Sequence, residues 1–129
     1  PLLIYQDRLN LLDREPQENG VTQYCADHGI GFISFSPLAQ GLLTDRYLNG
    51  IPADSRMAKE QYLKHSALTP ELLEQLKTWN AEAAERGETL AEMALAWILQ
   101  QKGVTSVLVG ASSVTQLEKN MKCVHAAKL

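Results

Sequence analysis

The sequence predicts an α/β fold that forms the later part of a (β/α)8 barrel. Three segments of β type alternate with segments of helical periodicity, which is the order expected of parallel βα units. A complete barrel of eight such units needs about 250 residues, whereas this chain has 129. That length supports one modest hydrophobic core. We therefore expect residues 1–129 to form one domain that corresponds to about strands 6 to 8 of a barrel with their helices.

The first part of the chain is expected to contain two strands separated by a short helix. Residues 2–9 (LLIYQDRL) form an apolar run of strand length, and the turn-forming residues of 13–20 predict a loop after it. Residues 21–28 have helical spacing and end at Gly29, a common helix stop. Residues 32–36 are almost continuously apolar, as in a parallel strand covered on both faces.

A long irregular segment, residues 37–68, follows the second strand. Connections of this length are uncommon in compact domains and usually carry a function. We expect this segment to contain binding residues, and its residues 39–68 to close over a ligand and so to gate its release.

Two helices are predicted next. Thr69 and Pro70 mark a helix start, after which apolar residues recur at helical spacing as far as Gly87. Thr89 and Glu92 form a capping box ahead of the second helix. The apolar run MALAWIL covers most of the circumference of this second helix, so we expect it to be buried.

The last part of the sequence predicts a third strand, a tight turn and a final helix. Residues 104–109 (VTSVLV) are rich in β-branched side chains, and Ser113 with Gln116 makes a capping box for the final helix. Barrel enzymes have their sites at the carboxyl ends of strands, often with a phosphate held at a helix N-terminus. The turn at residues 110–113 is therefore a candidate anion site, and a capped helix with nothing bound is the alternative.

Composition excludes several classes of function. A net charge of −3 with dispersed lysines and arginines leaves no basic stripe for nucleic acid or an anionic membrane. No apolar run approaches the roughly 20 residues that span a bilayer. Cys25 and Cys123 have no CxxC partner, and His28, His65 and His125 are isolated, so we expect no metal site. The chain is expected to be soluble and cytoplasmic.

Two motifs carry a family resemblance. The stretches FSPLAQGLLTDRYLNGIPADSR (residues 35–56) and SVLVGASSVTQLEKN (residues 106–120) resemble the C-terminal half of the aldo-keto reductases. They are most similar to the branch that contains potassium channel beta subunits and bacterial glyceraldehyde 3-phosphate reductases. The resemblance implies an NADP(H)-dependent oxidoreductase on a TIM barrel, which reduces aldehydes or ketones by hydride transfer.

The resemblance also implies a set of cofactor-binding residues. Gln6 would hold the nicotinamide carboxamide, with a polar residue at a strand mouth as the alternative. Phe35 would lie flat beneath the nicotinamide ring, with core packing as the alternative. Arg46 and Arg56 would contact phosphate from the long segment, with solvated surface arginines as the alternative. The remaining implied contacts, to the pyrophosphate, the ribose phosphate and the adenine, are Ser36, Pro37, Leu38, Ala39, Gly41, Gly110, Ser112, Gln116, Lys119 and Asn120.

The chain departs from the family pattern at Lys119, where the family usually has glutamate before the asparagine that Asn120 matches. A lysine cannot accept a hydrogen bond from the adenine amine. We expect Lys119 to favour the nearby phosphates instead.

The resemblance places the catalytic tyrosine, lysine, aspartate and histidine on earlier strands. None of Tyr5, Tyr24, Tyr47 and Tyr62 has the surroundings of that tyrosine, so we assign no catalytic residue to this chain. We expect the catalytic half to lie outside residues 1–129 and the chain alone to be inactive. Open strand edges would then pair with the missing half or with a second copy. An NADP(H)-binding regulatory subunit of the channel beta type and an inactive fragment are the alternatives.

Overall fold

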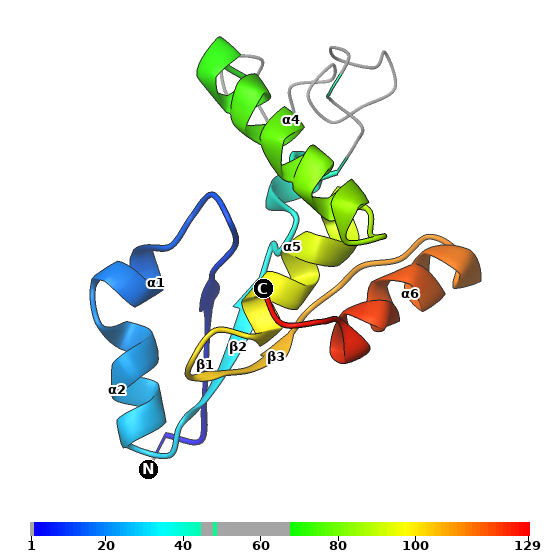
Figure 1. Cartoon of the computed structure of the whole chain (residues 1–129). Helices are drawn as coiled ribbons and strands as arrows, with labels where there is room; N and C mark the ends of the chain where they lie inside the picture. Colours follow the sequence, from blue (N-terminus) through cyan, green and yellow to red (C-terminus); the bar gives the residue numbers. More distant parts are fainter. Residues whose placement is uncertain (1, 45–47, 49–67) are drawn as a thin grey trace.

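The computed structural model describes residues 2–44, 48 and 68–129, and its centre is a three-stranded sheet (Figure 1). The strands are β1 (Ile4–Arg8), β2 (Gly31–Phe35) and β3 (Val104–Val107), hydrogen-bonded in the order β1-β2-β3. Both pairs are parallel, which confirms the predicted βα units. The registers pair Ile4 with Gly31 and Phe32 with Val104.

The helices are α1 (Glu15–Glu18), α2 (Val21–Asp27), α4 (Pro70–Glu85), α5 (Leu90–Leu99) and α6 (Val114–Met121), with short 3-10 helices η1 (Ala39–Gly41) and η4 (Lys122–His125). Figure 1 shows α1 and α2 beside β1, α5 crossing the sheet, and α4 extending away from it. No helix in the described part of the chain is long and apolar enough to cross a membrane.

Two sequence expectations need correction. The loop predicted over residues 13–20 contains the helical turn α1, because Pro16 lies in its first turn and is buried there. β1 and β3 are also shorter than their apolar runs, whereas β2 has the predicted length and begins one residue earlier. Leu3, before β1, and Leu108, after β3, are 76% and 47% exposed, so neither gains from burial in the described part of the fold.

Three helix starts follow the sequence prediction. Thr69, Thr89 and Ser113 each have extended backbone and accept, through the side-chain hydroxyl, a hydrogen bond of 3.1 Å from the backbone N–H three residues later. Each such cap contributes about 1 kcal/mol. These caps fix where α4, α5 and α6 begin.

One face of the sheet carries the hydrophobic core. The rings of Tyr5 and Phe32 lie 5.9 Å apart, and Phe32 is fully buried with Cys25 of α2 and the partly buried Trp97 of α5. Helices therefore pack on the side of the sheet that these residues face. The alternate residues of β1 and β2 face the other way.

The open face of the sheet is formed by Gln6, Arg8, Ile33 and Phe35, which the register pairs as Gln6 with Ile33 and Arg8 with Phe35. None of them belongs to a hydrophobic cluster of the described residues. In a (β/α)8 barrel the helices lie outside, and the strand face away from them lines the interior.

A second part of the core lies between α4 and α5. Leu76 of α4 and Leu90 and Met93 of α5 are buried together, which confirms that the run MALAWIL requires burial. Leu43, from the segment after β2, is fully buried in the same cluster. This contact anchors the segment after β2 to the helices.

Asn10 connects the end of β1 to the segment after β2. Its side chain is 1% exposed. The Nδ2 group donates to the carbonyl oxygen of Ser36 at 2.9 Å, and Oδ1 accepts from the backbone N–H groups of Leu12 at 2.9 Å and Asp13 at 2.8 Å. One buried side chain thus fixes both the turn after β1 and the first residue after β2.

We predict that Asn10→Ala lowers the free energy of unfolding by about 2–4 kcal/mol, because it leaves several backbone groups without their partner. Urea denaturation of the intact protein measures this loss. Asn19→Ala is the matched control, since exposed Asn19 accepts a single hydrogen bond of 3.1 Å from Val21 N–H. Its expected loss is below about 1 kcal/mol, and equal losses in the two variants would contradict the prediction.

Candidate functional site

A groove of about 950 Å³ opens at the carboxyl ends of β2 and β3. Its lining comes from the segments after these strands and from the beginnings of α5 and α6. Small-molecule sites have volumes of roughly 300–1,000 Å³ and in open α/β sheets lie beyond the carboxyl ends of the strands. We call this cavity the strand-end groove.

The strand-end groove brings together two segments that are far apart in the sequence. β2 and β3 are parallel neighbours, so the segments after them leave the same edge of the sheet. Nine of the fourteen predicted cofactor-binding residues line the groove, namely Ser36, Pro37, Leu38, Gly41, Gly110, Ser112, Gln116, Lys119 and Asn120.

The other five predicted residues do not line the groove. Ala39 lies in η1 and packs toward the core cluster that contains Leu43. Gln6 and Phe35 lie on the open face of the sheet. Arg46 and Arg56 fall outside the described residues, so the expectation that they close over a ligand stays a prediction.

Sequence analysis missed part of the lining. Gln40 and Thr44 lie in the segment after β2, and Thr89, Ala91 and Glu92 lie at the start of α5. The capping box of Thr89 and Glu92 was a usable signal, since it marks a helix N-terminus that follows the long segment. The other lining residues that were not predicted follow β3 and are Leu108, Val109 and Ala111.

Two helix starts contribute positive potential to the groove. α5 and α6 both begin at its wall, and a helix N-terminus presents free N–H groups and the positive end of the helix dipole. Lys119 adds a full positive charge, and Glu92 is the acidic residue of the described lining. The two helix N-termini together with Lys119 favour an extended anionic ligand that lies against both helix starts.

Ser112 and Gln116 contact each other on the groove wall. The Oε1 atom of Gln116 accepts from the backbone N–H of Ser112 at 2.7 Å and from its hydroxyl at 3.0 Å. This corrects the predicted capping box, because the Gln116 side chain binds the residue before the N-cap Ser113. Among the described residues no acceptor takes the Nε2–H donors of Gln116, so they are free to bind a ligand.

The segment after β2 is strained where it borders the groove. Ser36, Ala39 and Gln40 have positive φ angles of 51°, 49° and 58°, and Gly41 follows at 95°. A left-handed conformation costs a non-glycine residue about 1–2 kcal/mol. Such strain persists where surrounding contacts impose it, and it clusters at ligand sites. Here the contacts that impose it include the Asn10 bond to Ser36.

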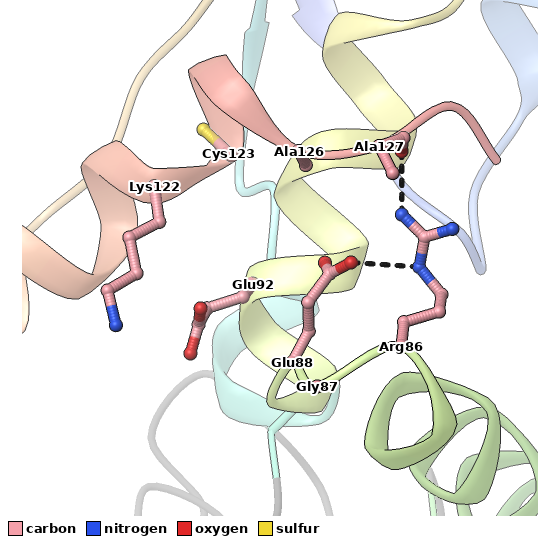
Figure 2. A pocket seen from close by; sticks show the side chains of 8 residues that line it. All are labelled: Arg86, Gly87, Glu88, Glu92, Lys122, Cys123, Ala126 and Ala127. Atoms are coloured by element: carbon pink, nitrogen blue, oxygen red, sulfur yellow. Dashed lines mark hydrogen bonds and ion pairs between the residues drawn. The ribbon is translucent and has the colours of Figure 1, made fainter.

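A smaller cavity of about 280 Å³ lies between the α4–α5 turn and the last residues of the chain (Figure 2). Arg86 Nε pairs with Glu88 Oε1 at 2.8 Å, and a terminal Arg86 nitrogen donates to the carbonyl oxygen of Ala127 at 2.6 Å. Gln100 donates to the same carbonyl at 3.1 Å. These bonds fasten the C-terminal segment, and Glu92 lines both this cavity and the strand-end groove.

Two ionisable groups outside the groove have raised pKa values. The Tyr5 hydroxyl donates to the Asp7 carboxylate at 2.9 Å, and this bond, with burial, raises the pKa of Tyr5. Burial raises the pKa of the Cys123 thiol, which keeps it protonated. In the described part of the chain no three His, Cys, Asp or Glu side chains gather where they could hold a metal ion.

Comparison with known proteins identifies relatives along the whole chain. A model of the aldo/keto reductase family matches residues 1–129. L-glyceraldehyde 3-phosphate reductase of Escherichia coli O157:H7 is 48% identical over 130 aligned positions, covering 97% of this chain and 37% of the relative. A probable voltage-gated potassium channel subunit beta of Arabidopsis thaliana is 37% identical over 130 positions, covering 98% of this chain and 40% of the relative.

The fold is also that of a solved relative. The crystal structure of a thermostable aldo-keto reductase in complex with the inhibitor epalrestat matches with a TM-score of 0.65 at 22% identity. The match covers 100% of this chain and 36% of that structure. The chain therefore spans less than half the length of the relatives it matches.

We predict that Gln40→Gly raises the free energy of unfolding by about 1 kcal/mol, because glycine relieves the left-handed strain. The variant also removes the Gln40 Oε1 atom, which is buried and has no hydrogen-bond partner in the described part of the chain. Thermal or urea unfolding measures the gain. Gln75→Gly in the exposed middle of α4 is the control and should lose about 1 kcal/mol. A loss in both variants would refute strain at Gln40.

Proposed function

Because the chain belongs to the aldo/keto reductase family, we propose that it supplies the NADP(H)-binding part of an oxidoreductase that reduces aldehydes or ketones. The observation that carries this proposal is the strand-end groove, where two distant segments with nine predicted cofactor contacts line one cavity. A groove of about 950 Å³ beside two helix N-termini suits an extended dinucleotide anion.

Different residues of the groove would bind different parts of the cofactor. The backbone around Ser36 and Leu38, with the helix starts, would hold the pyrophosphate. Ser112 and the Nε2–H donors of Gln116 would bind the phosphate on the adenosine ribose. Asn120, which is 7% exposed, would face the adenine.

The open face of the sheet would hold the reactive end of the cofactor. Gln6 offers both an amide donor and an acceptor for a carboxamide, and Phe35 offers a ring for stacking. When bound, NADPH supplies the hydride that reduces the carbonyl carbon. This chain would orient the ring, while the residue that protonates the carbonyl oxygen would lie outside residues 1–129. The chain alone would have no reductase activity.

We also propose that the chain corresponds to about strands 6 to 8 of the barrel, with the catalytic residues on the strands that would complete it. The relatives support a partial barrel, since the chain covers 37% and 40% of two of them. Pairing with the remaining strands, or with a second copy, would cover the open face. Both cysteines are free thiols, and a cytoplasmic location is proposed because thiols stay reduced there.

A regulatory role is the second candidate function. The 37% identity to a probable voltage-gated potassium channel subunit beta favours it. Both roles would use the same NADP(H) site, so cofactor binding does not separate them. Turnover does, because reduction of an aldehyde with loss of NADPH absorbance at 340 nm supports the enzyme, and tight NADPH binding without turnover supports the regulatory subunit.

We predict that Ser112→Asp in the intact protein weakens NADPH binding at least tenfold, because a carboxylate would oppose the ribose phosphate. Fluorescence titration with NADPH and NADH measures the effect, and NADH binding should fall less. Thr115→Asp is the matched control, since exposed Thr115 lies on α6 outside the groove lining. Similar NADPH losses in the two variants, or no NADPH binding by the wild type, would reject the proposed site.

A further prediction concerns Lys119, which lines the groove. Lys119→Glu should weaken NADPH binding several-fold, and added salt should reduce the difference from the wild type because it screens an exposed charge. Lys122→Glu is the control, since Lys122 lines the smaller cavity instead. Tighter NADPH binding by Lys119→Glu would show that the adenine contact outweighs the phosphate contact.

A further inference from the structure

Arg8 lies on the open face at the carboxyl end of β1. The register pairs it with Phe35, and its Cζ atom lies 5.5 Å from the centre of the Phe35 ring (Figure 1 shows β1 and β2 side by side). Its side chain is exposed in the described structure. Ser36, the next residue after Phe35, lines the strand-end groove, so Arg8 and the groove share one edge of the sheet.

The described residues supply no negative charge for this guanidinium. Its neighbour Asp7 faces the helix-covered side, where Oδ2 accepts from the Tyr5 hydroxyl at 2.9 Å and Oδ1 accepts from the backbone N–H of Arg8 at 2.7 Å. In the described part of the chain the Arg8 guanidinium therefore forms no ion pair, and its contact is the Phe35 ring.

A guanidinium inside a closed barrel requires a counter-charge. Burial of an unpaired charge is strongly unfavourable, and arginine cannot escape by losing its proton. The open face carries Arg8 into the barrel interior once the remaining strands cover it. An anionic group on a substrate would supply that counter-charge, since the carboxyl ends of barrel strands are where substrates bind.

We propose that Arg8 binds an anionic group, a carboxylate or a phosphate, on the carbonyl substrate. This inference rests on the proposed reductase function and adds its substrate class. The planar guanidinium can donate two parallel hydrogen bonds to either anion, and its contact with the Phe35 ring restricts its position. An aromatic ring has two faces, so Phe35 can carry Arg8 on one and the nicotinamide on the other.

The test compares two aldehydes of similar size in the intact protein, 4-carboxybenzaldehyde and the uncharged 4-nitrobenzaldehyde. The quantity measured is the ratio of their kcat/KM values. Arg8→Met keeps an apolar stem without the charge and should lower this ratio at least tenfold. Arg8→Lys keeps the charge without the planar fork and should lower it by about threefold.

Arg14→Met provides the matched control. The Arg14 Cζ atom also lies over an aromatic ring, 4.6 Å from the centre of Trp97, but Trp97 packs in the core on the helix-covered side. This variant should leave the ratio within twofold of the wild type. An Arg8→Met ratio equal to that of Arg14→Met overturns the inference, because the charge would then not contribute to substrate choice.

A binding measurement keeps the inference testable without turnover. Calorimetric titration should show that benzoate binds the wild type at least tenfold more tightly than benzamide, and that Arg8→Met removes this preference. Absence of both NADPH binding and aldehyde reduction would refute the proposed function, yet the benzoate result would still decide the role of Arg8. Equal binding of benzoate and benzamide by the wild type overturns that role.

Discussion

Parallel pairing of β2 with both of its neighbours is the constraint on which the candidate site depends. Parallel strands direct their carboxyl ends to one edge, so the segments that follow β2 and β3 meet there although the strands are far apart in sequence. The same pairing requires long crossover connections, and the connection between β2 and β3 contains α4 and α5. The parallel pairing therefore brings the segments after β2 and β3 and the start of α5 together around the groove.

Pairing alone would leave the segment after β2 free to adopt relaxed conformations. Three non-glycine residues with positive φ show that surrounding contacts hold it in a strained one. Asn10 holds one end of this segment through Ser36, and Leu43 holds the other in the core between α4 and α5. The anchored residues, Ser36 and Leu43, lie at the two ends of the strained segment, so the groove wall is shaped before any ligand arrives. Preformed walls reduce the entropy that binding must overcome.

Local signals accounted for most of the fold. Thr69, Thr89 and Ser113 could be recognised as caps because the hydroxyl and the N–H it accepts from are only three residues apart. The turn α1 was missed because a proline such as Pro16 is compatible both with a loop and with the first turn of a helix. Strand ends were overestimated because an apolar side chain such as Leu3 shows its preference for burial in the sequence, but not whether a neighbour covers it.

The site was predictable only where a motif named its residues. Both groove segments can be recognised in the sequence because each carries a distinctive motif, whereas their closeness depends on the pairing of β2 with β3. Gln40 and Glu92 enter the groove through tertiary packing, which no spacing rule describes. The partner of Gln116 also depends on geometry, since Ser112 and Ser113 both offer a nearby N–H and the sequence does not choose between them.

The registers of the sheet also set the order in which the chain can assemble. β1 and β2 join positions 4 and 31, which are 27 apart, whereas β2 and β3 join positions 32 and 104, which are 72 apart. Closing the longer connection costs about 0.9 kcal/mol more in chain entropy if both behave as flexible loops. During synthesis, β1, α2 and β2 can therefore pair early, while β3 must wait for α4 and α5. The groove is then among the last parts of the fold to form, and a ligand that fills it would stabilise the final docking of β3.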